Sequence, residues 1–588
     1  MKIPINRNSF WSELFTEQLA EIGIKFACIS PGSRSTPLTL AFAANKKIKT
    51  FVNPDERSSA FFALGLAEQS GSPVVIVTTS GTAVAELYPA IIEAYQRRIP
   101  LIVCTADRPP ELLNRGANQT INQSNIYANH IRKFFNAGLP SLTESKLLNI
   151  KKIAAEAVEI ALKKNRGPVH INFPFKKPLE PGTFTDKIDK TFYNKIKNIS
   201  IENYISTSNP PAAENLSSVV KAITRKPKGL IFCGWDNYRN DFAKLLTKFS
   251  KITGYPIIAD GISGLRFGNF SKHNVISNAS AFLKSGAYGF LLNADIIFQF
   301  GSAPTSNIAL DFIKDAKGTK ILINEFGDYK DPSGTTKSII SQNPSEFLHV
   351  AISLLNKKSA PEITEWLNKI RNLEINTEQI KKGKIFNADF PFEGRIIPEL
   401  IKCIPPNSNL VISNSMPVRD LDFFASPTRK KINVFSNRGA SGIDGVISTA
   451  AGIAAQSKKQ TYLVIGDLAF LHDVNGLNIL RNNKIPLKII LINNNGGGIF
   501  KMLPIANYNK FFREYFQTPQ SVNFKLLTKA YGGIFYNIKS FNDLINKLAC
   551  EREAESFTVL HIETDSESSV ELRKEYWQFV SNKLKKSF

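Results

Sequence analysis

Short apolar runs alternate with stretches suited to a helix along the whole chain of 588 residues. Most of these runs end in a polar or glycine-containing turn, as buried strands do. They fall into three groups, at 26–29, 74–77 and 101–104, then at 229–232, 256–259, 294–301 and 320–323, and last at 410–412, 462–465 and 487–492. Strands that alternate with helices are typical of doubly wound domains. The pattern therefore predicts an α/β fold of three doubly wound, mainly parallel-sheet domains.

Two polar stretches separate the three groups of runs. A prior of roughly 150 residues per domain gives three or four units for a chain of this length. The first polar stretch is rich in Lys, Asn and Pro and lacks apolar periodicity, and the second is strongly charged. The predicted division places α/β domains at 1–180, 219–356 and 385–588, with linkers at 181–218 and 357–384.

Two polar turns in the last third follow consecutive apolar runs, at 466–468 and 493–498. In a βαβ unit the carboxyl ends of both strands point the same way, so Asp467 and Asn494 can meet where open α/β sheets bind ligands. A carboxylate, an amide oxygen and the main-chain carbonyl of Gly496 are oxygen ligands that suit Mg²⁺. Gly-Asp alone fits an ordinary turn, but the paired Asn-rich turn favours a metal–diphosphate site.

Three further features are candidates for ligand binding. The glycine-rich loop at 436–445 opens the helix-like stretch 446–456, so its backbone can approach a phosphate. The turn at 30–37 also precedes a helix-like stretch, and its Arg34 lies between prolines in an arrangement suited to a carboxylate. Glu56 begins a helix-like stretch, where the helix dipole alone would favour a carboxylate.

The net charge is the unusual feature of the composition, because 74 Lys and Arg against 50 Asp and Glu give +24. The lysines are scattered, which favours a solvated basic exterior over a nucleic-acid surface. A positive field also suits a site for several carboxylates and phosphates. The charge therefore predicts small anionic substrates and no nucleic acid.

The five cysteines lie far apart without a CxxC pair, which argues against a disulfide framework or a zinc site. That usage is typical of a reducing cytoplasm. The sequence has no signal-peptide core and no run approaching about 18 apolar residues. We therefore expect a cytoplasmic protein without stable membrane association.

The two turns of the last third resemble the metal–diphosphate motif of thiamine diphosphate enzymes, which runs from Gly-Asp-Gly to Asn-Asn. Leu468 replaces the last glycine of that motif, and Gly-Asp-Leu is associated with one branch of these enzymes. The other motifs are similar to those of the 2-succinyl-5-enolpyruvyl-6-hydroxy-3-cyclohexene-1-carboxylate synthase family of menaquinone biosynthesis. They are Ser-Pro-Gly-Ser-Arg-Ser-Thr-Pro at 30–37, Asp-Glu-Arg at 55–57, Thr-Thr-Ser-Gly-Thr-Ala at 78–83, Ala-Asp-Arg-Pro-Pro-Glu-Leu at 106–112, Gly-Ala-Asn-Gln at 116–119 and Asn-Arg-Gly-Ala-Ser-Gly-Ile-Asp-Gly at 437–445.

The resemblance implies a pyrimidine-binding, a middle and a diphosphate-binding domain that use thiamine diphosphate with Mg²⁺, or with Mn²⁺ in its place. Glu56 would hydrogen-bond the aminopyrimidine ring, and Asp467, Asn494 and the Gly496 carbonyl would hold the metal. Other implied cofactor contacts are Ser415, Ile443, Ile499 and Phe500, of which the last two suit core packing equally well. The implied catalytic set, besides Glu56, lies around the substrates and comprises Arg34, Arg108, Asn118, Gln119, Arg419 and Arg438.

The implied activity is decarboxylation of 2-oxoglutarate and 1,4-addition of the resulting succinyl-semialdehyde carbanion to isochorismate. Both substrates are dianions, which fits bidentate arginine side chains. Glu56 and Asp467 lie on different domains, and the cofactor of these enzymes joins two subunits, so the resemblance implies a homodimer or a dimer of dimers. Two alternatives stay open, namely a thiamine diphosphate carboligase or decarboxylase for another 2-oxo acid, and a non-catalytic basic binding protein.

Overall fold

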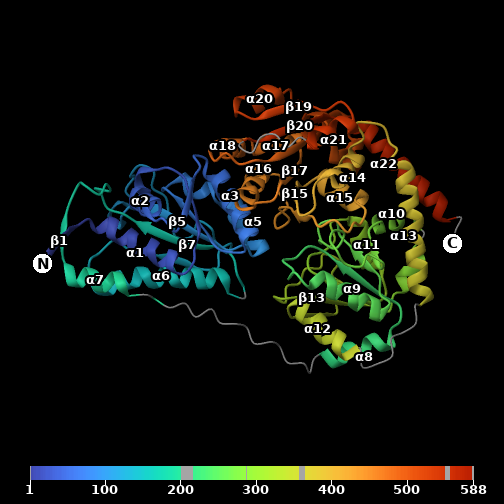
Figure 1. Ribbon diagram of the computed structural model, residues 1–588, viewed down its shortest axis with the longest axis horizontal. Coiled ribbons are helices and arrows are strands. Elements are labelled where there is room, and N and C mark those ends of the chain that lie inside the picture. The colour runs from blue at the N-terminus through green and yellow to red at the C-terminus, as the bar shows by residue number, and fades with distance from the viewer. Residues whose placement is uncertain are drawn as a thin grey trace.

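The computed structural model describes residues 2–163, 165–199, 201, 216–286, 288–355, 364–549 and 556–585. These residues form three separate six-stranded sheets whose strands are all parallel, each covered by helices. In Figure 1 the N-terminal sheet (blue to teal) lies at the left, the middle sheet (green) at the lower right and the C-terminal sheet (orange to red) above it. The prediction of three doubly wound α/β domains is confirmed.

The N-terminal sheet has the strand order β3-β2-β4-β5-β7-β6. Its strands are β2 (Phe26–Ile29), β3 (Lys49–Val52), β4 (Val74–Thr78), β5 (Leu101–Asp107), β6 (Phe134–Asn136) and β7 (Val169–Pro174). Its helices are α1 (Arg7–Glu21), α2 (Thr36–Ala44), α3 (Glu56–Ser70), α4 (Thr82–Glu86), α5 (Tyr88–Arg97) and α6 (Glu144–Leu162). The strands β4, β5 and β7 are buried at every position, because helices cover both faces of a parallel sheet.

The middle sheet has the order β11-β10-β9-β12-β13-β14. Its strands are β9 (Gly229–Cys233), β10 (Ile257–Ala259), β11 (Val275–Ile276), β12 (Ile296–Phe300), β13 (Thr319–Asn324) and β14 (Ser338–Ser341). Its helices are α8 (Leu216–Arg225), α9 (Phe242–Thr253), α10 (Ala279–Lys284), α11 (Asn307–Asp315) and α12 (Pro344–Leu355). The side chains of β9 and β12 separate two apolar clusters, one on each face of this sheet.

The C-terminal sheet has the order β16-β15-β17-β18-β20-β19. Its strands are β15 (Asn409–Ile412), β16 (Asn433–Phe435), β17 (Thr461–Gly466), β18 (Lys488–Asn493), β19 (Ile534–Asn537) and β20 (Thr558–Glu563). The main helices are α14 (Glu393–Cys403), α15 (Met416–Phe424), α16 (Val446–Gln456), α17 (Asp467–His472), α18 (Gly476–Asn482), α20 (Phe524–Ala530), α21 (Phe541–Ala549) and α22 (Ser566–Lys585). The neighbouring strands β15, β17 and β18 end at one edge of the sheet.

The segments predicted as linkers carry regular structure. Strand β8 (Asp186–Asp189) pairs antiparallel with β1 (Lys2–Ile5), and α7 (Lys190–Asn198) follows it and buries Ile196. The second predicted linker contains α13 (Glu365–Lys384), which packs against α22. Helix α7 packs on α6, and α13 also packs on α10. Residues 202–215 and 356–363 lie outside the described part of the chain.

The N-terminal and C-terminal domains share one continuous apolar core. Helix α3 crosses α16 at two glycines, Gly65 and Gly452, and Figure 1 shows the two helices side by side. A Cβ on Gly452 would overlap the carbonyl oxygen of Phe62 and would lie 2.8 Å from the amide nitrogen of Leu66. Glycine is therefore needed for the close approach of the two backbones.

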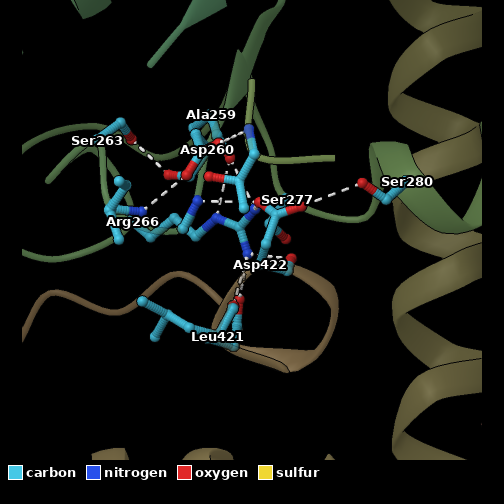
Figure 2. Close-up of polar contacts among 12 residues, drawn as sticks. Ala259, Asp260, Ser263, Arg266, Ser277, Ser280, Leu421 and Asp422 are labelled. Atoms are coloured by element: carbon cyan, nitrogen blue, oxygen red, sulfur yellow. Dashed lines mark hydrogen bonds and ion pairs between the residues drawn. The ribbon is translucent and has the colours of Figure 1, made fainter. Parts of the chain in front are cut away.

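A buried charge cluster joins the middle and C-terminal domains (Figure 2). The Arg266 guanidinium lies 2.8 Å from a carboxylate oxygen of Asp422 and donates to the carbonyls of Asp422 and Ala425 at the end of α15. Asp422 also accepts hydrogen bonds from the Gly261 amide and the Ser280 hydroxyl.

Every helix within the described residues is too short or too polar to cross a lipid bilayer.

Candidate functional site

A cavity of about 160 Å³ lies at the carboxyl ends of β15, β17 and β18. The predicted cofactor and metal residues that line it are Ser415, Ile443, Asp467, Asn494, Gly496, Ile499 and Phe500. All of its lining residues within the described part of the chain lie between Glu393 and Phe500. The cavity therefore belongs to the C-terminal domain alone, and Glu56 does not line it.

Asp467 is the first residue of α17, directly after β17, and its side chain is 2% exposed. One carboxylate oxygen accepts the Leu468 amide at 2.9 Å, and the other accepts the Gly496 amide at 2.6 Å. Burial raises the pKa of Asp467 to about 6, while these two amides lower it. Asp467 takes part in no ion pair among the described residues, so its carboxylate lacks a protein cation.

The glycine turn after β18 brings backbone atoms close to Asp467. A Cβ on Gly496 would overlap the Gln517 carbonyl, and a Cβ on Gly498 would lie 2.6 Å from the Asn494 side-chain nitrogen. The Gly496 backbone has φ of 121°, a conformation that favours glycine. The Asn494 amide group donates to Glu393 at 2.9 Å, which leaves its oxygen available as a ligand.

The donors at this turn fit a magnesium ion shared with a diphosphate. No group of three His, Cys, Asp or Glu side chains able to hold a metal occurs in the described ranges. The predicted set offers one carboxylate, one amide oxygen and one backbone carbonyl, and Mg²⁺ commonly combines so few protein oxygens with phosphate and water. The Asp467 carboxylate, buried without a cation, is the observation that fits this group.

Helix α15 carries Arg419, which contacts a residue that lines the cavity. Its N-cap residue Ser415, which lines the cavity, has φ of 68°. The Arg419 guanidinium donates to the Ser415 carbonyl at 2.6 Å, and Arg438 donates to the Asn414 side-chain oxygen at 2.9 Å. Burial lowers the pKa of Arg419, and the neighbouring Arg438 lowers it further. The two guanidiniums therefore repel each other, and a bound anion would relieve that repulsion.

Asn414 also fixes the glycine-rich loop at 436–445. Its side-chain nitrogen donates to the carbonyls of Asn437 and Gly442, both at 2.6 Å. Ile443 follows immediately, lines the cavity and packs against the core shared by the N-terminal and C-terminal domains. The loop thus carries both Arg438, which contacts Asn414, and Ile443, which lines the cavity.

A second arginine pair lies at the carboxyl edge of the N-terminal sheet. Arg34 donates to the Phe175 carbonyl at 2.9 Å, and Arg108 donates to the Ser80 hydroxyl. Burial lowers the pKa of Arg34, and Arg108 lowers it further, while Asp107 has the opposite effect. This pair does not line the C-terminal cavity of the same chain.

The predicted Asn-Gln pair lies beside these arginines only in part. The Gln119 side chain donates to the Ser80 carbonyl at 3.1 Å, next to the hydroxyl that Arg108 contacts. Both residues are exposed, and the Asn118 carbonyl accepts a hydrogen bond from the Thr120 hydroxyl. The structure therefore places Gln119, but not the Asn118 side chain, in the polar cluster around Ser80.

Glu56 is the first residue of α3 and is half-buried. Burial raises its pKa, and the charges of Asp55 and Glu86 raise it further. Its two chain neighbours contact the C-terminal domain, since Asp55 accepts from the Asn475 side chain at 2.6 Å and Arg57 donates to the His472 carbonyl at 2.9 Å. The start of α3 is therefore fixed against α17 and α18 of its own chain.

Sequence reasoning missed three charged residues behind the cavity. Glu393 and Asp420 line it, and both bind the buried guanidinium of Arg573 from α22. Glu393 also accepts from Asn494 and Thr564, so it orients a predicted metal ligand. Their partners lie more than a hundred positions away in the chain, and no local pattern indicates such pairs.

Comparisons with known proteins match all three domains. The family described as thiamine pyrophosphate enzyme, N-terminal TPP binding domain, matches residues 11–126. The family described as middle domain of thiamine pyrophosphate matches residues 201–412. The family described as thiamine pyrophosphate enzyme, C-terminal TPP binding domain, matches residues 424–562. A benzoylformate decarboxylase structure from Polynucleobacter necessarius has the same fold, with a TM-score of 0.68 at 14% identity over 95% of this chain and 98% of that chain.

Two curated relatives are similar over nearly their whole length. Both are named 2-succinyl-5-enolpyruvyl-6-hydroxy-3-cyclohexene-1-carboxylate synthase. The protein from Bacillus cytotoxicus is 36% identical over 98% of this chain and 97% of its own length. The protein from Haloquadratum walsbyi is 35% identical over 98% of this chain and 99% of its own length. These matches confirm the predicted family, and the chain belongs to the 2-succinyl-5-enolpyruvyl-6-hydroxy-3-cyclohexene-1-carboxylate synthase family of thiamine diphosphate enzymes.

Proposed function

We propose that this chain uses thiamine diphosphate and Mg²⁺ to decarboxylate 2-oxoglutarate and to join the remaining four-carbon unit to isochorismate by 1,4-addition. The chain is a thiamine diphosphate-dependent enzyme of this synthase family. It therefore serves menaquinone biosynthesis, as its relatives do. The observation that carries the residue assignments is the cavity at the carboxyl edge of the C-terminal sheet. We place this reaction in the cytoplasm.

The C-terminal cavity supplies groups for both ends of the cofactor. Asp467, Asn494 and the Gly496 carbonyl would hold Mg²⁺ and through it the diphosphate. Ser415, Ile443, Ile499 and Phe500 would contact the rest of the cofactor and exclude water. When bound, thiamine diphosphate supplies the electron sink for loss of carbon dioxide from a 2-oxo acid.

Glu56 would complete the site from the pyrimidine-binding domain. Its raised pKa, caused mainly by burial, suits a carboxyl group that shares a proton with a ring nitrogen of the cofactor. The cavity of the same chain is lined without it. We therefore propose that Glu56 serves a second copy of the chain in a homodimer or a dimer of dimers.

The two arginine pairs would bind the substrates' carboxylates. Arg419 and Arg438 each contact a residue that lines the C-terminal cavity, and Arg34 and Arg108 lie at the carboxyl edge of the N-terminal sheet. Burial lowers the pKa of all four guanidiniums, and none forms an ion pair within 4.0 Å in the described ranges. Partly desolvated, unpaired guanidiniums bind dicarboxylates well. Gln119 and Asn118 would assist on the N-terminal side.

The direct test is purified protein with thiamine diphosphate, Mg²⁺, 2-oxoglutarate and isochorismate. We expect loss of isochorismate and a product mass equal to both substrates minus carbon dioxide. Turnover of pyruvate but not of 2-oxoglutarate would instead indicate a carboligase or decarboxylase of different specificity. Absence of thiamine diphosphate binding in calorimetry, together with salt-sensitive DNA binding, would reject an enzymatic role.

Two variants separate the roles of the two domains. Glu56→Gln is expected to bind the cofactor with nearly unchanged affinity but to lose most hydrogen–deuterium exchange at the cofactor's C2. Asp467→Ala is expected to weaken metal-dependent cofactor binding, because it removes the buried carboxylate. Wild-type exchange in the first variant, or wild-type affinity in the second, would contradict the assigned role.

A further inference from the structure

Glu93 reaches from the N-terminal domain to the glycine-rich loop of the C-terminal domain. It lies on α5 and is 2% exposed. One carboxylate oxygen accepts the Gly439 amide at 2.8 Å, and the other accepts the Ala440 amide at 2.6 Å. Two consecutive amides of the loop are thus bound by one carboxylate from another domain.

The contact leaves no room for a side chain on the loop. A Cβ on Gly439 would lie 2.9 Å from a Glu93 carboxylate oxygen and 2.9 Å from the Cγ of Arg97. Such a distance is too short for a Cβ, so the loop is pressed directly against α5. The sequence Arg438-Gly439-Ala440 is therefore matched to Glu93 in shape as well as in hydrogen bonding.

The charge of Glu93 is balanced by Arg97, which lies at the meeting point of all three domains. The Arg97 Nε is 3.8 Å from Glu93, and its terminal nitrogens donate to Glu68 on α3, one of them at 2.9 Å. The Arg97 guanidinium also lies over the ring of Trp235 from the middle domain, 4.4 Å from its centre. A buried carboxylate needs such partners.

Glu93 and Asn414 bind the loop from two sides by hydrogen bonds. Asn414 holds the carbonyls of Asn437 and Gly442 from within the C-terminal domain. The residue between these contacts is Arg438, which faces the site through its bond to the Asn414 oxygen. Burial lowers the pKa of Arg438, and the charges of Asp260 and Glu93 oppose that effect. Glu93 therefore influences Arg438 both through the backbone and through charge.

We propose that Glu93 is a positioning residue, which fixes the loop at 436–445 so that Arg438 is held ready for a substrate carboxylate. The inference rests on the proposed function in one respect, the role of Arg438. Its physical basis is that a binding group must be held within a fraction of an ångström by its supporting contacts. Glu93 does not line the cavity, so it acts on Arg438 through the Gly439 and Ala440 amides and through its charge.

The test compares Glu93→Gln with Glu68→Gln. Both changes remove one negative charge beside Arg97, but only Glu93 contacts the loop. Glutamine has one acceptor oxygen, so in Glu93→Gln one loop amide must face an N–H group. We expect KM for a dicarboxylate substrate to rise roughly tenfold or more in Glu93→Gln, with less than a twofold change in Glu68→Gln. Equal effects of the two variants on KM would overturn the proposal.

Amide hydrogen exchange provides a readout that needs no substrate. A peptide spanning 436–445 is expected to exchange faster in Glu93→Gln than in wild type, and at the wild-type rate in Glu68→Gln. Unchanged exchange in Glu93→Gln would overturn the proposal even if activity fell. If the wild type fails to turn over 2-oxoglutarate, the proposed function fails. Faster exchange in Glu93→Gln but not in Glu68→Gln would still show that Glu93 fixes the loop. Should Glu93→Gln not fold, Glu93→Asp retains both acceptor oxygens and is expected to show smaller changes in both readouts.

Discussion

The C-terminal domain packs on both neighbours through apolar residues, but the two interfaces differ in their tightest contacts. The N-terminal domain meets it by close packing of α3 on α16, within one apolar core. The middle domain meets it through the buried Arg266–Asp422 pair, which also caps the end of α15 (Figure 2). The helix crossing depends on the fit of two backbones at glycine, whereas the Arg266 contact depends on buried charged and polar partners.

The difference matters because both interfaces support the same site. Helix α16 follows the loop that carries Arg438 and Ile443, and α15 carries Ser415 at its start and Arg419 one turn later. Shape complementarity can absorb small changes by repacking, whereas a buried charge that loses its partner cannot. We therefore expect the middle-domain interface to be the more sensitive to a single substitution.

The largest effect is expected from Arg266→Met. The change leaves Asp422 buried without its cation and leaves the carbonyls at the end of α15 without a donor. Removing one partner of a buried pair costs about 3–5 kcal/mol. The control is Arg239→Met, which removes a largely exposed pair with Glu346 and should cost about 0–1 kcal/mol. Equal shifts of the urea unfolding midpoint would show that the buried pair does not hold the interface.

A smaller effect is expected at the α3–α16 crossing from Gly452→Ala. The added methyl group would overlap the Phe62 carbonyl and crowd Gly65, so the helices must separate. Overpacking of this kind costs about 1–3 kcal/mol. The control is Gly383→Ala in α13, where an added Cβ meets nothing within 4 Å and should stabilise the helix by about 0.5–1 kcal/mol. A stabilised Gly452→Ala would contradict the close approach.

The fold was predictable from sequence where the signal is local. The ranges 26–29 and 446–456 coincide with β2 and α16, because an unbroken apolar run or a glycine-opened helix specifies its own limits. The turns that follow β17 and β18 were also predictable as neighbours, since parallel strands end at one edge.

The partners across domain interfaces were not predictable. Arg266 and Asp422 are 156 positions apart, and Glu93 and Gly439 are 346 apart. Each looks like an ordinary surface charge or turn residue in its own stretch, and only the packing of whole domains brings them together. The same reason explains why Glu393, behind the predicted metal ligand Asn494, escaped notice.

The last expected effect is a pH dependence at the N-terminal interface. Asp473 is fully buried and accepts hydrogen bonds from Ser58 on α3 and from the amide and hydroxyl of Ser448 on α16. Burial raises the pKa of Asp473 to about 7, whereas an unfolded aspartate titrates near pH 3.9. Between these values the folded protein binds the extra proton, so this group stabilises the fold at about pH 4, and that stability is lost as the pH rises to 7.

The stability of Asp473→Asn relative to the wild type should therefore rise as the pH increases. We expect the melting temperature of the variant relative to wild type to rise between pH 4 and 7.5, because the asparagine does not titrate while the wild type loses the stability that its raised pKa provides. The control is Asp189→Asn, an exposed N-cap whose pKa is lowered by the amide of Phe192, so its effect is confined to more acidic pH. A relative melting temperature of Asp473→Asn that falls with pH would mean that the buried carboxylate is ionised and stabilising. Asp473 would then be a second buried charge at the N-terminal interface, besides Glu93.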